Sequence, residues 1–186
     1  VLPEFFGIKA LKDADVVKAR EAEGQGPIQG FLTRMAKKHK VWLIGGSMPE
    51  ADAEHTYNTA FVFDRGGRQV AFHRKVHLFD INVEGGQYFR ESNTFSAGNS
   101  ITVFDTEFGK MGLCVCFDMR FPELARLMAL DGANVVFCPA SFNMTTGPAH
   151  WEILFRGRAV ENQVFTVGCA SARNVKASYI SYGNSI

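Results

Sequence analysis

The chain has 186 residues, of which 46% are hydrophobic and 21% charged, a composition typical of a globular domain that excludes disorder, collagen and coiled coil for the chain as a whole. Its 20 Lys and Arg residues stand against 19 Asp and Glu residues, for a net charge of +1, so no charged field points to nucleic acid as a partner. The apolar runs are much shorter than the roughly 18–20 residues of a membrane-spanning helix, so no membrane partner is expected either.

The first half of the chain begins with a mostly polar stretch and then has one helical and three strand-like patterns. Pro27 suits the first turn of a helix, and the apolar residues after it recur at helical spacing. Two strand-like runs flank Arg65-Gly66-Gly67-Arg68, a sequence typical of a hairpin turn. In chain order we expect a helix at 27–40 and strands at 41–44, 57–64 and 69–74.

A weakly periodic, glycine-containing stretch at 77–98 predicts a loop, and beyond it short apolar runs alternate with amphipathic segments. This alternation is typical of an α/β protein whose helices cover a sheet. No linker, repeat or low-complexity segment interrupts it, so residues 1–186 are expected to form a single domain. In chain order we expect strands at 101–105 and 111–116, a helix at 122–130, a strand at 134–138, a helix at 148–161 and a strand at 164–169. The helix at 148–161 is expected to bury Trp151, Leu154, Phe155 and Val160 as its apolar set.

Both ends of the sequence look cut. It opens on Val1-Leu2-Pro3-Glu4 without an initiator methionine, and it closes on Tyr182-Gly183-Asn184-Ser185-Ile186 without a closing helix or charged tail. We therefore expect a domain that is truncated at both termini, with any targeting peptide upstream of Val1.

Four cysteines, Cys114, Cys116, Cys138 and Cys169, lie in apolar runs of the second half. Their spacing forms no disulfide framework, which predicts reduced thiols and an intracellular setting, cytoplasmic or mitochondrial. The close pairs His73 and His77, and Cys114 and Cys116, are not followed by the second pair that a zinc site needs, so no metal is expected. No nucleotide-binding loop is present, and no cofactor is expected.

Three residues are candidates for covalent acyl transfer, although each also has a structural explanation. Cys116 ends a strand-like run before a turn into a helix, where a thiol is presented beside free backbone N–H groups; a packed core cysteine is the alternative. Glu4 follows a strand end and suits a general base, or only a helix-start acid. Lys75 alternates with hydrophobic residues and suits oxyanion stabilisation, or only a solvated run of charges.

Three segments in order resemble the signature segments of the nitrilase superfamily of carbon–nitrogen hydrolases, and the resemblance spans essentially the whole chain. They are Val1-Leu2-Pro3-Glu4, Arg74-Lys75-Val76-His77-Leu78 and Gly112-Leu113-Cys114-Val115-Cys116-Phe117-Asp118-Met119-Arg120-Phe121-Pro122-Glu123. The resemblance implies a Glu4-Lys75-Cys116 triad on a four-layer α-β-β-α sandwich that dimerises sheet to sheet. It also implies that Glu91 supports the triad, either partly protonated or paired with Lys75, and that the Phe117 backbone N–H and Lys75 hold the oxyanion.

Further segments are similar to the Nit2-like branch of this superfamily, the ω-amidases: His77-Leu78-Phe79-Asp80-Ile81, the loop at 141–152 and Ala177-Ser178-Tyr179. The likeness implies hydrolysis of the terminal amide of dicarboxylic keto-acid monoamides, such as 2-oxoglutaramate and 2-oxosuccinamate, to the acid and ammonia through a cysteine thioester. Arg120 is then expected to bind the second carboxylate, with Phe142 as an apolar wall and Thr146 as a hydroxyl donor. Pairing of Arg120 with Glu123, and loop packing by Phe142 and Thr146, are the alternatives.

Three other functions stay open. The sister branch that acts on deaminated glutathione shares Gly147-Pro148-Ala149-His150-Trp151 and the Cys116 segment. The cut ends leave room for an inactive fragment or an interaction module. A thiol redox protein using Cys114 and Cys116 is disfavoured, because alternate residues of a strand are poorly placed for a disulfide. Separately, Arg158 and Glu161 are expected to pair on the helix at 148–161, and His150 and Trp151 are expected to pack at its start.

Overall fold

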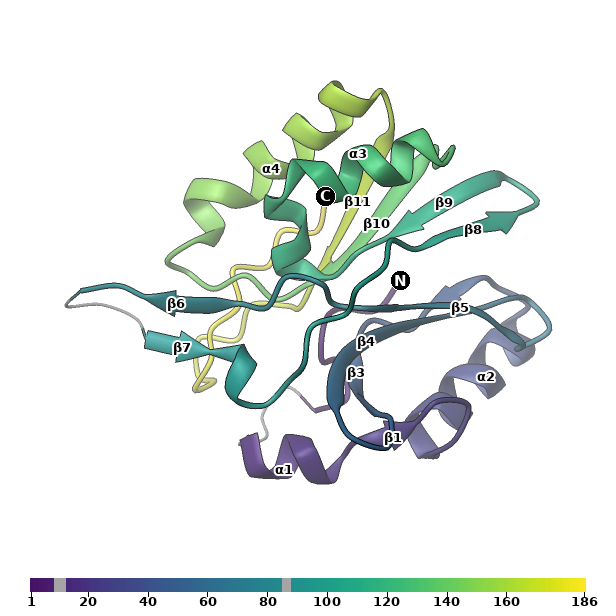
Figure 1. Ribbon diagram of the computed structural model, residues 1–186, viewed down its shortest axis with the longest axis horizontal. Coiled ribbons are helices and arrows are strands. Elements are labelled where there is room, and N and C mark those ends of the chain that lie inside the picture. The colour runs from purple at the N-terminus through teal and green to yellow at the C-terminus, as the bar shows by residue number, and fades with distance from the viewer. Residues whose placement is uncertain (9–12, 85–87) are drawn as a thin grey trace.

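The computed structural model describes residues 1–8, 13–84 and 88–186 (Figure 1). Its helices in chain order are α1 (Asp13–Lys18), α2 (Pro27–His39), the 3-10 helices η1 (Glu91–Asn93) and η2 (Cys116–Arg120), α3 (Pro122–Leu130) and α4 (Gly147–Asn162). Its strands are β1 (Glu21–Ala22), β2 (Leu43–Ile44), β3 (Met48–Ala51), β4 (Thr56–Phe63), β5 (Gln69–Arg74), β6 (Asp80–Asn82), β7 (Tyr88–Arg90), β8 (Val103–Thr106), β9 (Gly109–Leu113), β10 (Val135–Ala140) and β11 (Phe165–Ala170).

The first sheet is built around β4. This strand runs antiparallel to β2, β3 and β5, while β1 lies parallel to β3. Successive side chains of a strand point to opposite faces, so Phe61 and Phe63 of β4 pack with Leu32 of α2, whereas Ala60 and Val62 belong to the core shared with the second sheet. The helix α2 therefore covers the outer face of this sheet (Figure 1).

The second sheet has the order β11-β10-β9-β8, with β9, β10 and β11 parallel and β8 antiparallel to β9. The helices α3 and α4 cover the face that is turned away from the first sheet (Figure 1). Because parallel strands end at the same edge of a sheet, the segments that follow β9, β10 and β11 begin close together. That edge carries the candidate active site.

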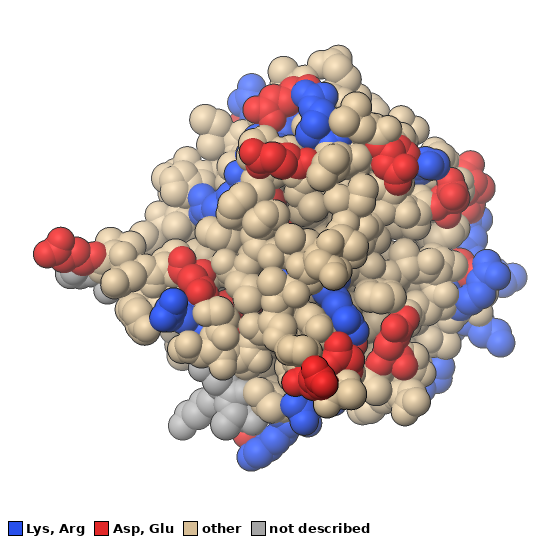
Figure 2. Space-filling model, in the orientation of Figure 1, with Lys and Arg blue, Asp and Glu red and all other residues tan. Residues whose placement is uncertain are grey.

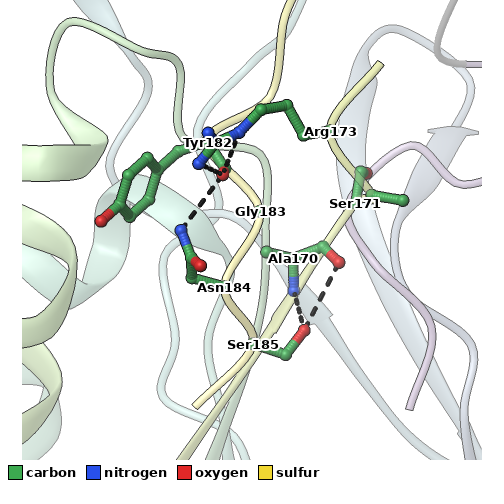
Figure 3. A pocket seen from close by; sticks show the side chains of 8 residues that line it. Ala170, Ser171, Arg173, Tyr182, Gly183, Asn184 and Ser185 are labelled. Carbon is green, nitrogen blue, oxygen red and sulfur yellow. Dashed lines mark hydrogen bonds between the residues drawn. The ribbon is translucent and has the colours of Figure 1, made fainter.

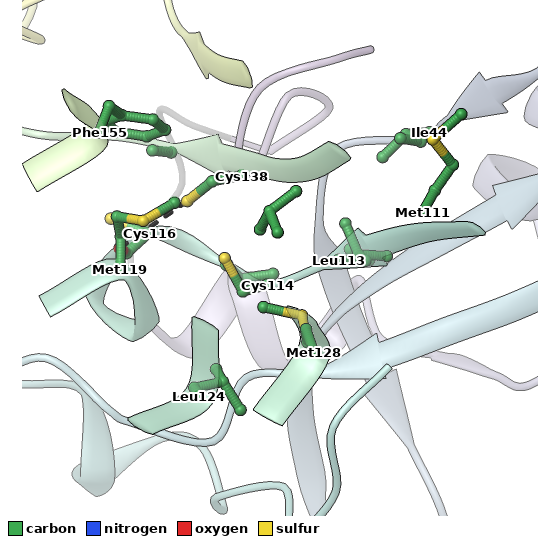
Figure 4. Close-up of a cluster of buried hydrophobic side chains, with 14 of the residues drawn as sticks. Ile44, Met111, Leu113, Cys114, Cys116, Met119, Leu124, Met128, Cys138 and Phe155 are labelled. Atoms are coloured by element: carbon green, nitrogen blue, oxygen red, sulfur yellow. Dashed lines mark hydrogen bonds between the residues drawn. The ribbon is translucent and has the colours of Figure 1, made fainter. Parts of the chain in front are cut away.

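The largest buried cluster joins the two sheets to α3 and α4. Figure 4 shows Cys114, Cys116 and Cys138 side by side within it, below Phe155 of α4. Complete burial of an aromatic side chain such as Phe155 stabilises a fold by roughly 2–3 kcal/mol. With α2 on one side and α3 and α4 on the other, the expected four-layer α-β-β-α architecture is confirmed.

The expected helices and strands are present, with ends shifted by up to three residues. Two details were wrong. Val160, expected on the buried face of α4, is 71% exposed. Cys116 does not end a strand: β9 stops at Leu113, and Cys116 opens η2. The reason is that the Asp118 carboxylate accepts a hydrogen bond from the Val115 N–H at 3.0 Å and draws the chain into a turn.

Several short elements lie where the sequence predicts none. The expected loop at 77–98 contains η1 and the β6–β7 hairpin, which projects from the body of the molecule (Figure 1). The polar stretch before Pro27 contains α1 and β1, and β3 precedes β4. The sequence of β3 does not show the hydrophobic pattern of a strand, because Glu50 is buried through ion pairing with Arg74 rather than through apolar packing.

Acidic and basic side chains interleave across the face in Figure 2, in keeping with the net charge of +1. Of the helices in residues 1–8, 13–84 and 88–186, none combines the length and apolarity needed to cross a bilayer.

Candidate active site

A buried cluster of three charged side chains joins distant parts of the chain. The Lys75 ammonium donates hydrogen bonds to Glu4 Oε1 at 3.0 Å and to Glu91 Oε2 at 2.8 Å. All three side chains are buried, and buried charges need partners of opposite sign within reach. The structure thus places Glu91 in an ion pair with Lys75, which is one of the two arrangements that the sequence left open.

The backbone beside Glu4 is held by the chain that follows β2. The Phe5 N–H donates to Ser47 Oγ at 3.2 Å. Gly46 has a φ of +64°, and a Cβ added to it would lie 2.2 Å from the Pro3 carbonyl oxygen. Only glycine allows this approach, so the Gly45-Gly46 pair that ends the predicted strand also seats the Glu4 turn.

Lys75 is positioned by backbone hydrogen bonds on both sides. It directly follows β5, its N–H donates to the Asn58 carbonyl oxygen at 2.8 Å, and its own carbonyl oxygen accepts from the Gly98 N–H at 2.8 Å. Burial by itself would lower the pKa of Lys75, but the attraction of Glu4 and Glu91 outweighs it and holds the pKa well above the ordinary value. The side chain therefore carries a fixed positive charge.

The two carboxylates differ in how many of their oxygens are occupied. Glu91 accepts from Asn58 Nδ2 on Oε1 at 2.9 Å, and from Lys75 Nζ and the Phe79 N–H on Oε2. Glu4 accepts from both Lys75 and Asn58 on the same oxygen, Oε1. No residue in the described part of the chain donates to Glu4 Oε2, so Glu4 is the carboxylate with an oxygen free for proton transfer.

Cys116 sits at a strained turn of the backbone. Its φ of +48° lies in the left-handed region, which a non-glycine residue rarely adopts. It opens η2, and the N–H of the next residue, Phe117, donates to no residue that the structure describes. A thiol next to an unoccupied backbone N–H is the geometry expected of a nucleophile with an oxyanion donor.

The Cys116 thiol is protonated at rest. Burial raises its pKa well above the ordinary value and the Glu4 carboxylate adds to this, while Lys75 and a backbone hydrogen bond from Ser141 act in the opposite direction. Such a thiol needs a base to become a nucleophile, and Glu4 is the neighbouring acceptor.

Asp118 connects the Cys116 turn to the strand end that carries Lys75. Its carboxylate contacts His73 Nε2 at 3.0 Å, and His77 through both the backbone N–H at 2.8 Å and Nδ1 at 2.9 Å. Lys75 lies between these two histidines in sequence, so one carboxylate fixes both sides of the lysine relative to the nucleophile. In the described ranges, no three His, Cys, Asp or Glu side chains are grouped to hold a metal ion.

Replacing Asp118 by alanine is expected to destabilise the fold by about 3–5 kcal/mol, because His73, His77 and the Val115 N–H lose a buried charged partner. Burial alone would raise the pKa of Asp118, but the hydrogen bonds from His73 and His77 hold it far below its usual range. The stabilisation is therefore complete above the unfolded pKa of about 4 and is lost as the pH falls below it. Urea unfolding at pH 7 and pH 3.5 measures this. Replacing exposed Asp105 by alanine, as the control, should change stability by less than about 0.5 kcal/mol at either pH.

Arg120 lies close to Cys116 but does not pair with Glu123. Its guanidinium lies over the rings of Phe117 and Phe142, at 5.3 Å and 5.1 Å from their centroids, and Nη1 contacts His150 Nδ1 at 3.0 Å. No ion pair with Glu123 occurs among the described residues. Arg120 Nε is buried without a partner in the described chain, and a buried donor left unpaired in this way needs an explanation.

Phe142 and Thr146 both make packing contacts. Phe142 is buried with its ring edge against Trp151, at a centroid distance of 5.0 Å. The Thr146 hydroxyl donates to Asn143 Oδ1 at 3.1 Å. Both residues therefore shape the loop after β10, and Phe142 also presents its ring to Arg120.

Arg158 holds the far end of η2. As expected it pairs with Glu161, at 3.0 Å. It also donates to the carbonyl oxygens of Met119 and Arg120 at 3.2 Å and 3.0 Å. The last helix thereby fixes the backbone that carries Arg120.

A separate pocket lies between the segment after β11 and residues 182–185 (Figure 3). Arg173 and Asn184 both donate to the Tyr182 carbonyl oxygen, and the Ser185 hydroxyl contacts Ala170. None of the charged residues of the cluster around Lys75 lines this pocket, so it is not the candidate active site.

Sequence reasoning missed several residues of the site. Asn58 lies in a run of apolar strand residues and gives no local signal. Asp118 stands inside a quoted segment, but its role depends on His73 and His77, which are about 40 positions away. His150 was expected only to pack at a helix start. Tyr179 donates from its hydroxyl to the Ser141 carbonyl oxygen beside the nucleophile, and burial raises its pKa.

Known proteins share this arrangement of segments. A family model described as carbon-nitrogen hydrolase matches residues 1–186. A hydrolase of Schizosaccharomyces pombe is 48% identical over the whole chain, which spans 58% of that protein's length. Omega-amidase NIT3 of Saccharomyces cerevisiae is 44% identical over the whole chain, which spans 65% of its length. Omega-amidase NIT2 of Homo sapiens is 50% identical over 83% of the chain, and the match covers 56% of that protein.

Solved structures agree with these matches. The crystal structure of Saccharomyces cerevisiae Nit3, a member of branch 10 of the nitrilase superfamily, superposes with a TM-score of 0.89 at 42% identity, covering all of this chain and 66% of that one. The Caenorhabditis elegans NitFhit protein superposes with a TM-score of 0.85 at 33% identity, covering all of this chain and 46% of that one.

Proposed function

The chain belongs to the carbon–nitrogen hydrolase family, and from this premise we propose that residues 1–186 form one domain of an ω-amidase. The substrates would be monoamides of small dicarboxylic keto acids, such as 2-oxoglutaramate and 2-oxosuccinamate, hydrolysed to the acid and ammonia. The observation that carries the proposal is the buried contact of Lys75 with Glu4 and Glu91, together with the action of the Glu4 and Lys75 charges on the Cys116 thiol. The 44% and 50% identities to proteins named omega-amidase support the substrate class.

The first half of the reaction forms a thioester. Glu4 Oε2 takes the Cys116 proton as the sulfur attacks the amide carbon. Lys75 has three N–H bonds, of which two are used by Glu4 and Glu91, so the third is available to the oxyanion together with the Phe117 N–H. The proton on Glu4 passes to the leaving nitrogen, and ammonia departs from the acyl-cysteine.

The second half regenerates the thiol. Glu4, again a carboxylate, takes a proton from water, whose oxygen attacks the thioester carbon. The same Lys75 and Phe117 donors hold the second oxyanion. The C–S bond then breaks, the sulfur recovers its proton from Glu4 and the dicarboxylic acid leaves. Glu91, whose oxygens are both occupied, keeps Lys75 in place throughout.

Arg120 would select substrates with a second carboxylate. Its buried Nε is an unused donor, and burial, which lowers the pKa of the guanidinium, is opposed by the nearby Cys116. Phe142 would supply the apolar wall under the substrate chain, and Thr146 would add a hydroxyl. A planar guanidinium suits a carboxylate because it offers two parallel hydrogen bonds.

Replacing Arg120 by methionine is expected to raise the KM for 2-oxoglutaramate by about 10- to 100-fold, since a charge-assisted contact contributes roughly 1.5–3 kcal/mol. Turnover of a neutral aliphatic amide, which lacks the second carboxylate, should change by less than about threefold, and this substrate is the control. Steady-state ammonia release measures both. An equal loss on the two substrates would show that Arg120 only packs.

The test of the proposed function is a substrate panel on the full-length protein. Release of ammonia from 2-oxoglutaramate at a rate well above that from deaminated glutathione supports the ω-amidase. The reverse order would favour the sister branch, which shares Gly147-Pro148-Ala149-His150-Trp151. Absence of turnover on every amide would favour an inactive interaction module, although an intact charged cluster argues against that alternative.

The assembly and compartment follow as further parts of the proposal. The outer helices expose Leu127, Leu130, Ile153 and Val160, each at least half-exposed, which supports a homodimer. Since both sheets have helices on their outer faces, a second copy would meet these helices rather than a sheet. Sedimentation of the full-length protein as a monomer would contradict this. The four unpaired cysteines support an intracellular setting, cytoplasmic or mitochondrial.

A further inference from the structure

One buried side chain at the centre of the site has no role in the chemistry described so far. Asn58 lies in β4 and has 0% of its surface exposed. Its Nδ2 donates to Glu4 Oε1 at 3.0 Å and to Glu91 Oε1 at 2.9 Å. A single neutral amide group therefore donates to both carboxylates and bridges them.

The orientation of this amide is settled by chemistry. An ionised carboxylate only accepts hydrogen bonds, so the NH₂ end of the Asn58 amide must face Glu4 and Glu91. The other end, Oδ1, is buried without a partner among the described residues. A buried acceptor left unpaired costs stability, which offsets part of what the two hydrogen bonds of Nδ2 contribute, so stability alone does not account for an asparagine at this position.

The charges of the cluster explain what the amide does. Two carboxylates face one ammonium, so the group carries one negative charge more than Lys75 neutralises. Two carboxylates in a dry site tend to share a proton. Each hydrogen bond donated to a carboxylate favours its ionised form, and Asn58 donates one to each.

We propose that Asn58 is a positioning residue that keeps Glu4 and Glu91 ionised together, so that Glu4 can act as the base toward Cys116. The inference rests on the proposed amidase function for its consequence in turnover. By filling Glu4 Oε1 together with Lys75, Asn58 also leaves Oε2 as the oxygen available to the thiol.

The other titratable groups that act on Glu4 do not take up protons at acidic pH. Burial would lower the pKa of Lys75, but Glu4 and Glu91 raise it, and burial raises the pKa values of Cys116, Cys138 and Tyr179. These four groups stay protonated from neutral pH downwards. These four groups therefore do not set the acidic limb of the activity profile.

The experiment replaces Asn58 by leucine, which removes the donors, and by aspartate, which keeps the shape and adds a third carboxylate. With leucine we expect the acidic limb of kcat/KM to move up by about one to two pH units, with activity at pH 7 reduced about 10- to 100-fold and partly recovered at higher pH. The Asn58→Asp variant should move the acidic limb of kcat/KM further up in pH. KM should change less than kcat.

The matched control is Asn162→Leu. Asn162 is also buried, donates one hydrogen bond from Nδ2 to the Arg158 carbonyl oxygen, and also has an unpartnered Oδ1 in the described chain. It lies at the end of α4, away from the carboxylates. This variant should lose a similar amount of stability, and its pH profile should stay that of the wild type.

A second readout separates this inference from the proposed function. The rate at which iodoacetamide alkylates Cys116 also depends on a base, and it can be measured as a function of pH whatever the natural amide is. If 2-oxoglutaramate is not hydrolysed but the alkylation limb moves in both Asn58 variants, the substrate proposal fails and the role of Asn58 stands. Variants that react more slowly with an unmoved limb would overturn the role of Asn58.

The wild-type protein provides a test that does not depend on the folding of a variant. In protein labelled with ¹⁵N-asparagine, the Asn58 side-chain protons should exchange slowly with solvent. Their chemical shifts should change over the same pH range as the acidic limb of the activity profile. Rapid exchange, or signals that do not change across that limb, would contradict the proposal.

Discussion

Replacement of Cys116 by alanine is expected to reduce ammonia release from 2-oxoglutaramate by at least about 1,000-fold, because no other group can form the thioester. The fold should survive, since alanine is only slightly smaller and the strained φ of +48° at this position is the same for both residues. The measurement is steady-state turnover together with thermal unfolding of the full-length protein.

The control for this prediction is Cys114→Ala. Cys114 is also buried, two positions earlier, and its thiol donates to the Phe137 carbonyl oxygen at 3.7 Å. This variant should keep its activity. Loss of activity in both variants would favour a working thiol pair, and full activity in Cys116→Ala would exclude the triad.

Replacement of Lys75 by methionine should have the largest combined effect on activity and stability. It removes the cation between Glu4 and Glu91 and the side-chain donor to the oxyanion, so we expect turnover to fall by at least about 1,000-fold. It also leaves two carboxylates unpaired in a buried site, which should lower the free energy of unfolding by about 3–5 kcal/mol.

The loss of stability in Lys75→Met should depend on pH. Without the ammonium, the folded variant gains from binding a proton between Glu4 and Glu91, so it holds more protons than the unfolded chain above about pH 4.3. By linkage, its stability then falls as the pH rises. Urea unfolding should find a smaller difference from the wild type at pH 5 than at pH 8. Exposed Lys110 replaced by methionine is the control, with no such trend, and an equal difference at both pH values would contradict the expected proton uptake.

Local patterns in the sequence predicted the main elements because each depends on neighbouring residues. The helix that became α4 follows from apolar residues at helical spacing. The hairpin between β4 and β5 follows from a glycine-rich turn. By contrast, β3 was missed because Glu50, a polar residue, is buried against an arginine of another strand. A pattern of hydrophobicity does not register burial that is achieved by ion pairing.

The residues of the candidate site likewise divide into those that the sequence indicated and those that it did not. Glu4, Lys75 and Cys116 stand in segments long enough to resemble a known family. Glu91 was placed by that resemblance alone. Asn58 and Asp118 were not identified, because each contacts partners that are far away in the sequence.

The sequence by itself determined the α/β class and the order of most elements, and it indicated three candidate reacting groups, since spacing and residue type are local properties. Only the tertiary structure decided which carboxylate has a free oxygen, that Arg120 faces His150 rather than Glu123, and that one amide joins Glu4 to Glu91. These facts depend on contacts between residues up to 71 positions apart, as in the Glu4–Lys75 pair. The 20 basic and 19 acidic residues balance to a net charge of +1, but only the fold buries Lys75 together with Glu4 and Glu91.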